Sequence, residues 1–174
     1  RTVVTIHDLA FFRNPGWFRS DRALYYQFAM RLVVSNVDLI LTGSQATAND
    51  LQDFLNISPK KIRVTPYAAR DQFRPVSEEA KRSVREKYGL PTTFFLCLGT
   101  FEPRKNLVRC VEAFSLWADK LRSDLVLAGR WGWKAASLRE AINRSTVRER
   151  IHLPGFVEDA DLPALLNAAT ALVY

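Results

Sequence analysis

The sequence predicts an α/β protein built from two parallel-sheet units. Short apolar runs of strand length alternate with amphipathic stretches of helical spacing, which is the pattern of parallel sheets covered by helices on both faces. The alternation stops once, in a stretch without periodicity at residues 69–76, and then begins again. With 174 residues and 48% hydrophobic content, the chain can bury one sizeable core or two smaller ones.

Three short apolar runs predict the strands of the first unit. Each contains mostly β-branched residues or leucine, which suits a buried parallel strand. Turn-forming segments, Asn14-Pro15-Gly16 and Ser58-Pro59, interrupt the chain between them. The predicted strands are Val3–Ile6, Leu39–Leu41 and Ile62–Thr65.

Two helices are predicted between these strands. Ser20 is the expected N-cap of a helix over residues 21–35, because a serine side chain can accept a hydrogen bond from a free amide of the first turn. Ser44 is the expected N-cap of a second helix that ends near Leu55. Apolar spacing places Leu24, Phe28, Leu32 and Ser35 on one side of the first helix, and Leu51, Phe54 and Leu55 on the inner side of the second.

The alternation begins again at Ser77. This serine with Glu78 and Glu79 predicts a helix N-terminus, and Gly89 followed by Pro91 predicts its end. The further predicted strands are Phe94–Leu98, Leu125–Gly129 and Ile151–Leu153, with Pro154-Gly155-Phe156 ending the last and Ala171–Tyr174 starting another. The further predicted helices cover 107–121 and 136–144, and a last one starts at Asp161 with Leu162, Leu165, Leu166 and Ala169.

The segment from Phe94 to Asn106 is the most informative part of the chain. An apolar strand ends at Gly99, and a short turn then places Arg104 and Lys105 at the N-terminus of an amphipathic helix. Free backbone N–H groups and the helix dipole favour an anion there, whereas paired cations without an anion are unfavourable. We therefore predict a site for the diphosphate of a nucleotide or nucleotide-activated molecule. The apolar face of the helix consists of Leu107, Cys110, Val111, Phe114, either Trp117 or Ala118, and Leu121.

Several other residues follow predicted strands. Ligands of open parallel sheets bind at the carboxyl ends of the strands, so these residues are candidates for the same site. We expect one cleft between the two units to collect them. They are His7, Gly43-Ser44, Gly129-Arg130 and Gly155-Phe156.

The formal net charge of +7 is distributed along the chain. Residues 1–75 hold 10 Lys and Arg against 6 Asp and Glu, and residues 76–174 hold 15 against 12. No basic block and no zinc-finger or RNA-recognition signature is present, which disfavours nucleic acid as a partner. No apolar run approaches the roughly 18 residues of a membrane span and no signal peptide is visible, so we expect a cytoplasmic protein.

The two cysteines, Cys97 and Cys110, are predicted to be free thiols that pack as small apolar residues in a reducing compartment. No companion Cys or His has ligand spacing, which disfavours a metal site, and a disulfide is disfavoured too. Among the remaining polar residues, Asp8 is expected to hold loop amides, and His152 is expected to be structural.

Taken in order, these motifs resemble the retaining glycosyltransferases of family four, which have the GT-B architecture of two Rossmann-like domains. The resemblance covers essentially the whole chain. The motifs that carry it are Thr5-Ile6-His7-Asp8-Leu9, Asp38 to Ser44, Lys61 to Tyr67, Leu98-Gly99-Thr100 through Arg104-Lys105-Asn106, Leu125 to Gly129, Ile151 to Phe156, and Asp161-Leu162.

The resemblance implies a domain plan in which both domains are incomplete. Residues 1–68 would be the C-terminal part of the N-terminal, acceptor-side domain, and residues 69–76 the interdomain linker. Residues 77–174 would be the N-terminal part of the donor-binding domain. In keeping with this, the sequence does not begin with Met and both of its ends read as strands, so we expect a fragment of a longer protein.

The same resemblance implies the activity of the intact protein. It would transfer a sugar, with mannose from GDP-mannose as the candidate, from a GDP- or UDP-sugar to an acceptor hydroxyl with retention and without a metal or further cofactor. His7 would contact the sugar, while Arg104 and Lys105 would stabilise the departing diphosphate. The remaining donor-binding residues would be Gly99, Thr100, Gly129, Phe156 and Val157.

Two departures from the family pattern matter. Many relatives place an arginine directly after the loop glycine, where this chain has Thr100. The paired glutamates of the family are expected shortly after Tyr174, and the glycine-rich loop near the family's N-terminus is absent. We therefore expect the chain as given to be inactive by itself.

Several alternatives stay open at this point. Another enzyme of the same architecture, such as a phosphorylase or a sugar-nucleotide epimerase, is the first. A non-catalytic nucleotide- or nucleic-acid-binding module is the second. The third concerns the aromatic and cationic residues between Phe11 and Arg31, which are interpreted as packing and surface charge or as a surface for a lipid-linked acceptor at the inner membrane face. Trp131 and Trp133 either wall the donor cleft or cover the sheet edge.

Overall fold

The computed structural model describes residues 1–174 and divides them into two compact units, Arg1–Ala69 and Arg70–Tyr174. Each unit contains one sheet, and all strand pairs in both sheets are parallel. The predicted α/β class is therefore confirmed. None of the helices is both long enough and apolar enough to cross a membrane.

The first unit has a three-stranded sheet in the order β1-β2-β3. Its strands are β1 (Val3–Thr5), β2 (Leu39–Thr42) and β3 (Ile62–Val64). Ile40 in the central strand is fully buried and pairs in register with Val4 on one side and Ile62 on the other. The predicted strands are thus present, with ends that differ by one residue.

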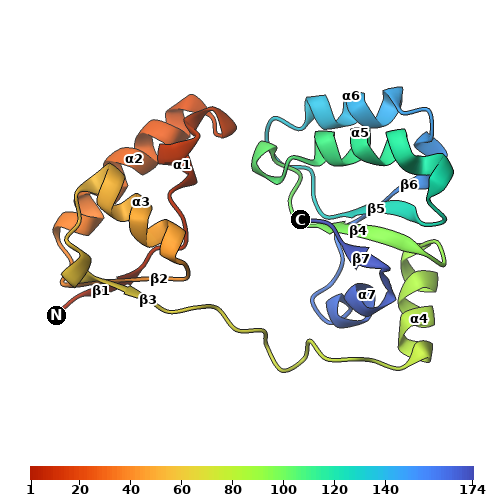
Figure 1. Ribbon diagram of the computed structural model, residues 1–174, viewed down its shortest axis with the longest axis horizontal. Coiled ribbons are helices and arrows are strands. Elements are labelled where there is room, and N and C mark those ends of the chain that lie inside the picture. Colours follow the sequence, from red (N-terminus) through yellow and green to blue (C-terminus); the bar gives the residue numbers. More distant parts are fainter. The chain divides into compact units, whose positions relative to one another are not determined.

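The helices of this unit are α1 (Ala10–Arg13), α2 (Ser20–Ser35) and α3 (Gln45–Leu55), and they lie on one face of the sheet (Figure 1). The prediction that helices cover both faces is wrong for this unit. On the face opposite Ile40, Val3 is 55% exposed and its partner Leu39 is only partly buried. Alternate residues of a strand point to opposite faces, so a sheet with helices on one face buries only half of its side chains.

Helix α2 differs from its prediction in two ways. Ser20 is the first helical residue instead of the N-cap, and the preceding Arg19 makes no side-chain capping bond. The predicted apolar side faces solvent. The residues that the helix buries are Ala23 and Val34, and Val34 belongs to the core cluster against which the partly buried Met30 also packs. The exposed large side chains of this helix include Leu24, Tyr25, Phe28 and Leu32.

Local capping chemistry is confirmed elsewhere. The Ser44 hydroxyl accepts a hydrogen bond from the Thr47 amide at 3.2 Å, as expected of an N-cap. Ser77 caps α4 (Glu78–Tyr88) in the same way, and Gly89 ends that helix in the left-handed conformation with φ +60°. The sequence did not predict the four-residue helix α1, which is too short to show a period.

The second unit has a four-stranded sheet in the order β6-β5-β4-β7. Its strands are β4 (Phe94–Leu98), β5 (Asp124–Ala128), β6 (Ile151–Gly155) and β7 (Ala171–Leu172). The last four residues of β5 are all buried, which explains the uninterrupted apolar run in the sequence. The carboxyl ends of β4 and β5 lie side by side, with Leu98 paired to Ala128.

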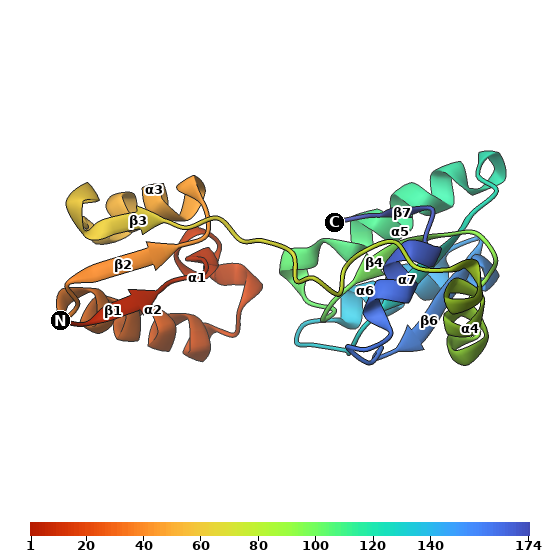
Figure 2. The same ribbon diagram turned by 90° about the horizontal axis from the view of Figure 1, so that it is seen from below.

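Helices cover both faces of this second sheet, as predicted. Helices α5 (Leu107–Trp117) and α6 (Ala136–Arg144) lie on one face, and α4 and α7 (Leu162–Ala168) lie on the other (Figures 1 and 2). Each face has its own core. Ala118 is 1% exposed whereas Trp117 is 55% exposed, so Ala118 completes the buried face that begins on α5.

Strand β6 continues through Pro154 to Gly155, two residues beyond the prediction. Proline lacks a donor for a sheet ladder and is tolerated in an edge strand or at an irregularity. Strand β6 is at the edge of the sheet, and its register with β5 shifts between Val126 and Ala128. No helix or strand occurs from Thr65 to Ser77, which includes the predicted linker.

Candidate functional site

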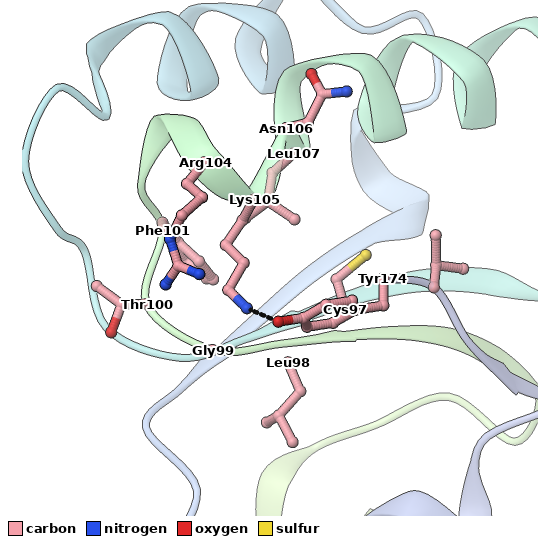
Figure 3. Close-up of a pocket in the computed structure, with 11 residues that line it drawn as sticks. Cys97, Leu98, Gly99, Thr100, Phe101, Arg104, Lys105, Asn106, Leu107 and Tyr174 are labelled. Carbon is pink, nitrogen blue, oxygen red and sulfur yellow. Dashed lines mark hydrogen bonds between the residues drawn. The ribbon is translucent and has the colours of Figure 1, made fainter. Parts of the chain in front are cut away.

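The loop after β4 forms the centre of the candidate site. Gly99 adopts φ +131°, a conformation that L side chains rarely adopt, and a single 3-10 turn over Pro103–Lys105 leads into α5. Asn106 then takes the left-handed conformation with φ 52°. In Figure 3 the side chains of Arg104 and Lys105 point from this turn toward the end of β4, while that of Asn106 points away.

Phe101 anchors the loop to the rest of the unit. Its side chain is 2% exposed and meets Trp131 edge-on at a centroid distance of 5.0 Å. Its amide donates to the Arg130 carbonyl at 2.9 Å, and its own carbonyl accepts from the Gly132 amide at 3.1 Å. Trp131 therefore packs against the loop through Phe101, and it does not line either of the two cavities beside the loop.

Gly129 allows the loops after β4 and β5 to approach each other. A Cβ atom at Gly129 would lie 1.9 Å from the Gly99 carbonyl oxygen, and its φ of +151° also disfavours other residues. The Gly129 amide donates to the Gly155 carbonyl at 2.7 Å, which links the ends of β5 and β6. The predicted glycines of the second unit, Gly99, Gly129 and Gly155, thus lie at one end of its sheet.

Arg104 is paired with an acidic neighbour that the sequence reasoning did not consider. Its Nη2 atom lies 2.8 Å from Oε1 of Glu102, a side chain that is only 6% exposed. A buried carboxylate is costly without a partner, and the Arg104 guanidinium group compensates the negative charge of Glu102. With Glu102 counted, the loop carries a net charge of +1, whereas Arg104 and Lys105 alone suggested +2.

Lys105 supplies that cation. Its Nζ atom donates to the Tyr174 hydroxyl at 2.5 Å and lies 4.0 Å from the centre of the Tyr174 ring (Figure 3). The Lys105 hydrogen bond and positive charge lower the pKa of Tyr174. A cavity of about 330 Å³ opens beside Lys105, bounded by Gly99, Thr100 and Tyr174.

The N-terminus of α5 faces the same loop and carries no side-chain cap. The first N–H groups of a helix have no partner within the helix and carry partial positive charge. Together with the Lys105 ammonium group, they make this end of the sheet suited to an anion such as a diphosphate.

A second cavity, of about 430 Å³, shares the walls Leu98, Gly99 and Thr100 with the first. It brings together all the predicted donor-binding residues beyond the phosphate loop. Arg130 lies over the Phe156 ring, with its guanidinium carbon 4.1 Å from the ring centre, and Val157 is 3% exposed. The other lining residues are Gly129, Asp159 and Leu162.

His7 belongs to the first unit, where it follows β1. Its Nδ1 atom lies 2.6 Å from the Tyr67 hydroxyl, and its side chain is exposed. The Tyr67 ring in turn packs on Gly43, where a Cβ atom would lie 2.1 Å from the ring. Asp8 accepts a hydrogen bond from the Ala10 amide at 3.0 Å, so it holds the loop as predicted.

Sequence reasoning missed several residues of these sites. Tyr67 follows a predicted strand, and this position could have marked it as a candidate site residue. Phe101 and Glu102 could not be found in this way, because their roles depend on contacts that only the folded loop creates. Tyr174 is 69 residues from its partner Lys105. No group of three or more His, Cys, Asp or Glu side chains is placed to hold a metal ion.

Comparison with known proteins identifies the family of this arrangement. Residues 80–174, which include the loop and both cavities, match the family described as glycosyl transferases group 1.

Two curated relatives from Escherichia coli align with the whole chain. O-antigen chain mannosyltransferase B is 32% identical over 177 residues, and serotype-specific mannosyltransferase WbdA is 29% identical over 182 residues. The chain spans 46% of the first relative and 22% of the second.

A crystal structure of Anabaena Alr3699/HepE in complex with UDP-glucose has a TM-score of 0.73 with this chain at 19% identity. The match covers 98% of this chain and 45% of that one. At this level of identity the match establishes a common fold, and it confirms the predicted GT-B type.

Proposed function

Because this chain belongs to the group 1 glycosyl transferases, we propose that the full-length protein transfers a sugar from a nucleotide-sugar donor to an acceptor hydroxyl. The observation that carries the proposal is the position of Lys105, which lies beside a cavity at the uncapped N-terminus of α5. Mannose is the proposed sugar, since both curated relatives are named mannosyltransferases.

The proposed chemistry follows from the charges at this site. When the bond between sugar and diphosphate breaks, negative charge develops on the diphosphate oxygens. The Lys105 ammonium group and the first-turn amides of α5 would stabilise that charge, and Arg104 would act from its pair with Glu102. The interaction strengthens as the bond breaks, because the negative charge on the diphosphate grows. Cations that are already in place also cost little reorganisation. Retention of the anomeric configuration and a contact between His7 and the sugar are parts of the same proposal.

The second cavity would hold the nucleoside, and its polar residues favour guanine. Arg130 offers donors that suit the O6 and N7 acceptors of guanine, and Asp159 offers a carboxylate that suits the N–H groups at N1 and N2. Uracil presents a single N–H group between two carbonyl oxygens and cannot satisfy both residues in the same way. We therefore propose a GDP-sugar as the donor in preference to a UDP-sugar.

The acceptor and location are proposed from the relatives. Two are named for O-antigen synthesis or serotype, so a carbohydrate or lipid-linked acceptor is proposed. The two free thiols are consistent with a cytoplasmic protein. A peripheral contact with the inner membrane face belongs to the same proposal.

The test is ligand-induced thermal stabilisation of the full-length protein. GDP at about 100 times its Kd should stabilise the protein by about 2.7 kcal/mol, and UDP at the same concentration should stabilise it less. Lys105→Ala should remove most of the GDP shift, because it deletes the cation nearest the diphosphate.

Lys120→Ala is the matched control, since Lys120 follows the opposite end of α5 and lies against Trp117. It removes the same charge and should leave the GDP shift unchanged. An equal GDP shift in the Lys105 variant and the unmodified protein would contradict the diphosphate assignment. Transfer of mannose from GDP-mannose to an oligosaccharide acceptor, lost in the Lys105 variant, tests the reaction itself.

A further inference from the structure

The two cysteines lie close together beside the candidate diphosphate loop. Cys97 is in β4, is 2% exposed and lines the cavity that Lys105 borders. Cys110 is in the first half of α5 and is partly exposed. Their Sγ atoms are 3.4 Å apart, and both thiols are free. A disulfide bond has a length of about 2.05 Å, so a movement of less than about 1.5 Å would join them.

The pair differs from two ordinary buried thiols in its proton affinity. The hydrogen bond with Cys110 and burial both raise the pKa of the Cys97 thiol. The same hydrogen bond lowers the pKa of Cys110, because the Cys97 thiol can donate to a Cys110 thiolate. Cys110 is also the more exposed of the two. A thiolate that is accessible to small molecules is the nucleophile of thiol–disulfide exchange.

We propose that Cys97 and Cys110 form a redox modification site, at which a low-molecular-weight disulfide oxidises the pair and thereby moves the 99–106 loop out of its working geometry. The modification itself is independent of the proposed function, whereas its effect on sugar transfer rests on it. Cytosolic disulfides in mesophiles are usually transient and regulatory or catalytic, which fits a site of this kind.

The reaction balances in two steps. The Cys110 thiolate attacks one sulfur of the small disulfide, forms a mixed disulfide and releases one small thiolate. Cys97 then loses its proton and attacks the Cys110 Sγ atom, which releases the second small thiolate. The two protein thiols lose two electrons and two protons in total, and the small disulfide becomes two thiols. The negative charge of the Cys110 thiolate also raises the pKa of Cys97. Because the first step consumes this thiolate, Cys97 then loses its proton more easily, which favours the second step.

The new bond would act directly on the loop. Cys97 precedes Gly99, and Cys110 follows Asn106, so the pair encloses the whole segment that holds Arg104 and Lys105. Drawing the Sγ atoms together pulls α5 toward β4, while Phe101 keeps the middle of the loop fixed through Trp131 and the Arg130 carbonyl. A displacement of about 1 Å at a catalytic group can reduce a rate by about 100-fold.

The first arm of the experiment tests the modification. The full-length protein is reduced, freed of reductant and incubated with oxidised glutathione, and its peptides are analysed by mass spectrometry. We expect a Cys97–Cys110 cross-linked peptide that has lost two hydrogen atoms, reversed by dithiothreitol. The Cys110→Ala variant should give no cross-link. Glutathione adducts on Cys110 without the cross-link in the unmodified protein would overturn the proposal.

The second arm tests the consequence. Oxidation should lower the rate of sugar transfer at least tenfold and reduce the GDP-induced thermal shift, and dithiothreitol should restore both. Cys110→Ala should transfer sugar at the unmodified rate before and after oxidant, and Cys110→Ser provides the same test if the alanine variant folds poorly. A complete cross-link with an unchanged rate would overturn the regulatory part. Absence of transfer in the reduced protein would instead count against the proposed function, and the cross-link result would still decide the modification.

Discussion

Gly129 illustrates how single residues determine the geometry of the candidate site. Its missing side chain allows the loop after β5 to meet the Gly99 carbonyl oxygen, and its amide holds the end of β6. The two glycines therefore act together: Gly99 allows the chain to turn, and Gly129 leaves the space beside that turn free. Lys105 depends on this arrangement, since it lies in the same loop.

Gly129→Ala should be strongly destabilising, by about 2–4 kcal/mol in urea denaturation, since the new Cβ atom forces backbone away from backbone at an unfavourable φ. It should also weaken the GDP-induced thermal shift. Gly16→Ala is the matched control, because a Cβ atom there has no neighbour within 4 Å, and it should change stability by less than about 0.5 kcal/mol. Equal stability of the two variants would contradict the close approach.

At the level of elements, charged side chains connect segments that are distant in sequence. Arg150 donates to the Asp124 carboxylate at the start of β5 and to three carbonyl groups in the chain that leads to that strand. His152 lies 2.8 Å from the same carboxylate. These contacts lie at the amino end of β5, away from the candidate site at its carboxyl end. The three carbonyl groups belong to Ala118, Leu121 and Ser123.

Arg150→Lys should destabilise the second unit by about 2–4 kcal/mol, because a lysine ammonium group cannot reach four acceptors in a planar arrangement and leaves partly buried carbonyl groups unpaired. The GDP affinity at a temperature where the variant is folded should be unchanged. Arg144→Ala is the control, since its pair with Glu140 is exposed on both sides. A loss below about 1 kcal/mol for Arg150→Lys would show that the cluster adds little.

Helices α4 and α7 are joined by Asp161. Its Oδ2 atom accepts from the Lys87 ammonium group at 2.7 Å and from the Tyr88 hydroxyl at 2.6 Å. These two hydrogen bonds lower the pKa of Asp161, although partial burial opposes the shift. A lowered pKa in the folded state adds stability above the unfolded pKa of about 3.9, and this stability is lost as the pH falls through the folded pKa.

Asp161→Asn should therefore reduce the free energy of unfolding by about 1 kcal/mol at pH 7, and the difference from the unmodified protein should shrink as the pH falls below about 4. Urea denaturation at a series of pH values measures both quantities. Asp159→Asn, two residues away and exposed, removes the same charge and should change the free energy of unfolding at pH 7 by less than about 0.5 kcal/mol. A difference that stays constant from pH 7 to pH 3 would refute the assignment.

For the whole molecule, the charge distribution separates the proposed function from nucleic-acid binding. The net charge of +7 is divided into +4 for residues 1–75 and +3 for residues 76–174, so neither half is strongly basic. Within the candidate site, Arg104 is already paired with Glu102. Apart from Lys105 at the first cavity and Arg130 at the second, the excess positive charge is thus spread along the chain.

We expect weak, salt-sensitive association with DNA of random sequence, with a Kd above about 10⁻⁵ M near physiological salt. Fluorescence anisotropy of a labelled duplex measures this affinity. GDP should displace the duplex only if the duplex also binds at Lys105. Nanomolar DNA binding that persists in Lys105→Ala, together with no response to GDP, would favour the alternative of a nucleic-acid-binding module.

Much of the fold could be predicted because its signals are local. The strands of the second unit appear as apolar runs, and Ser44, Ser77 and Gly89 mark helix ends by interactions within a few residues. The buried side of α2 could not be predicted, because the helix buries Ala23 and Val34 and leaves the larger apolar side chains Leu24 and Phe28 exposed. The same limit applies to β6, whose edge position makes Pro154 acceptable.

The sequence by itself determined the two-part α/β organisation, the family, and the loop between Gly99 and Asn106 as the place for an anion. Only the tertiary structure decided which of the two neighbouring cations is available there, since Glu102 neutralises Arg104 and Tyr174 orients Lys105. It alone brought Cys97 within 3.4 Å of Cys110. The physical reason is that periodicity and capping act over a few residues, whereas pairing, burial and close approach depend on which distant segments meet.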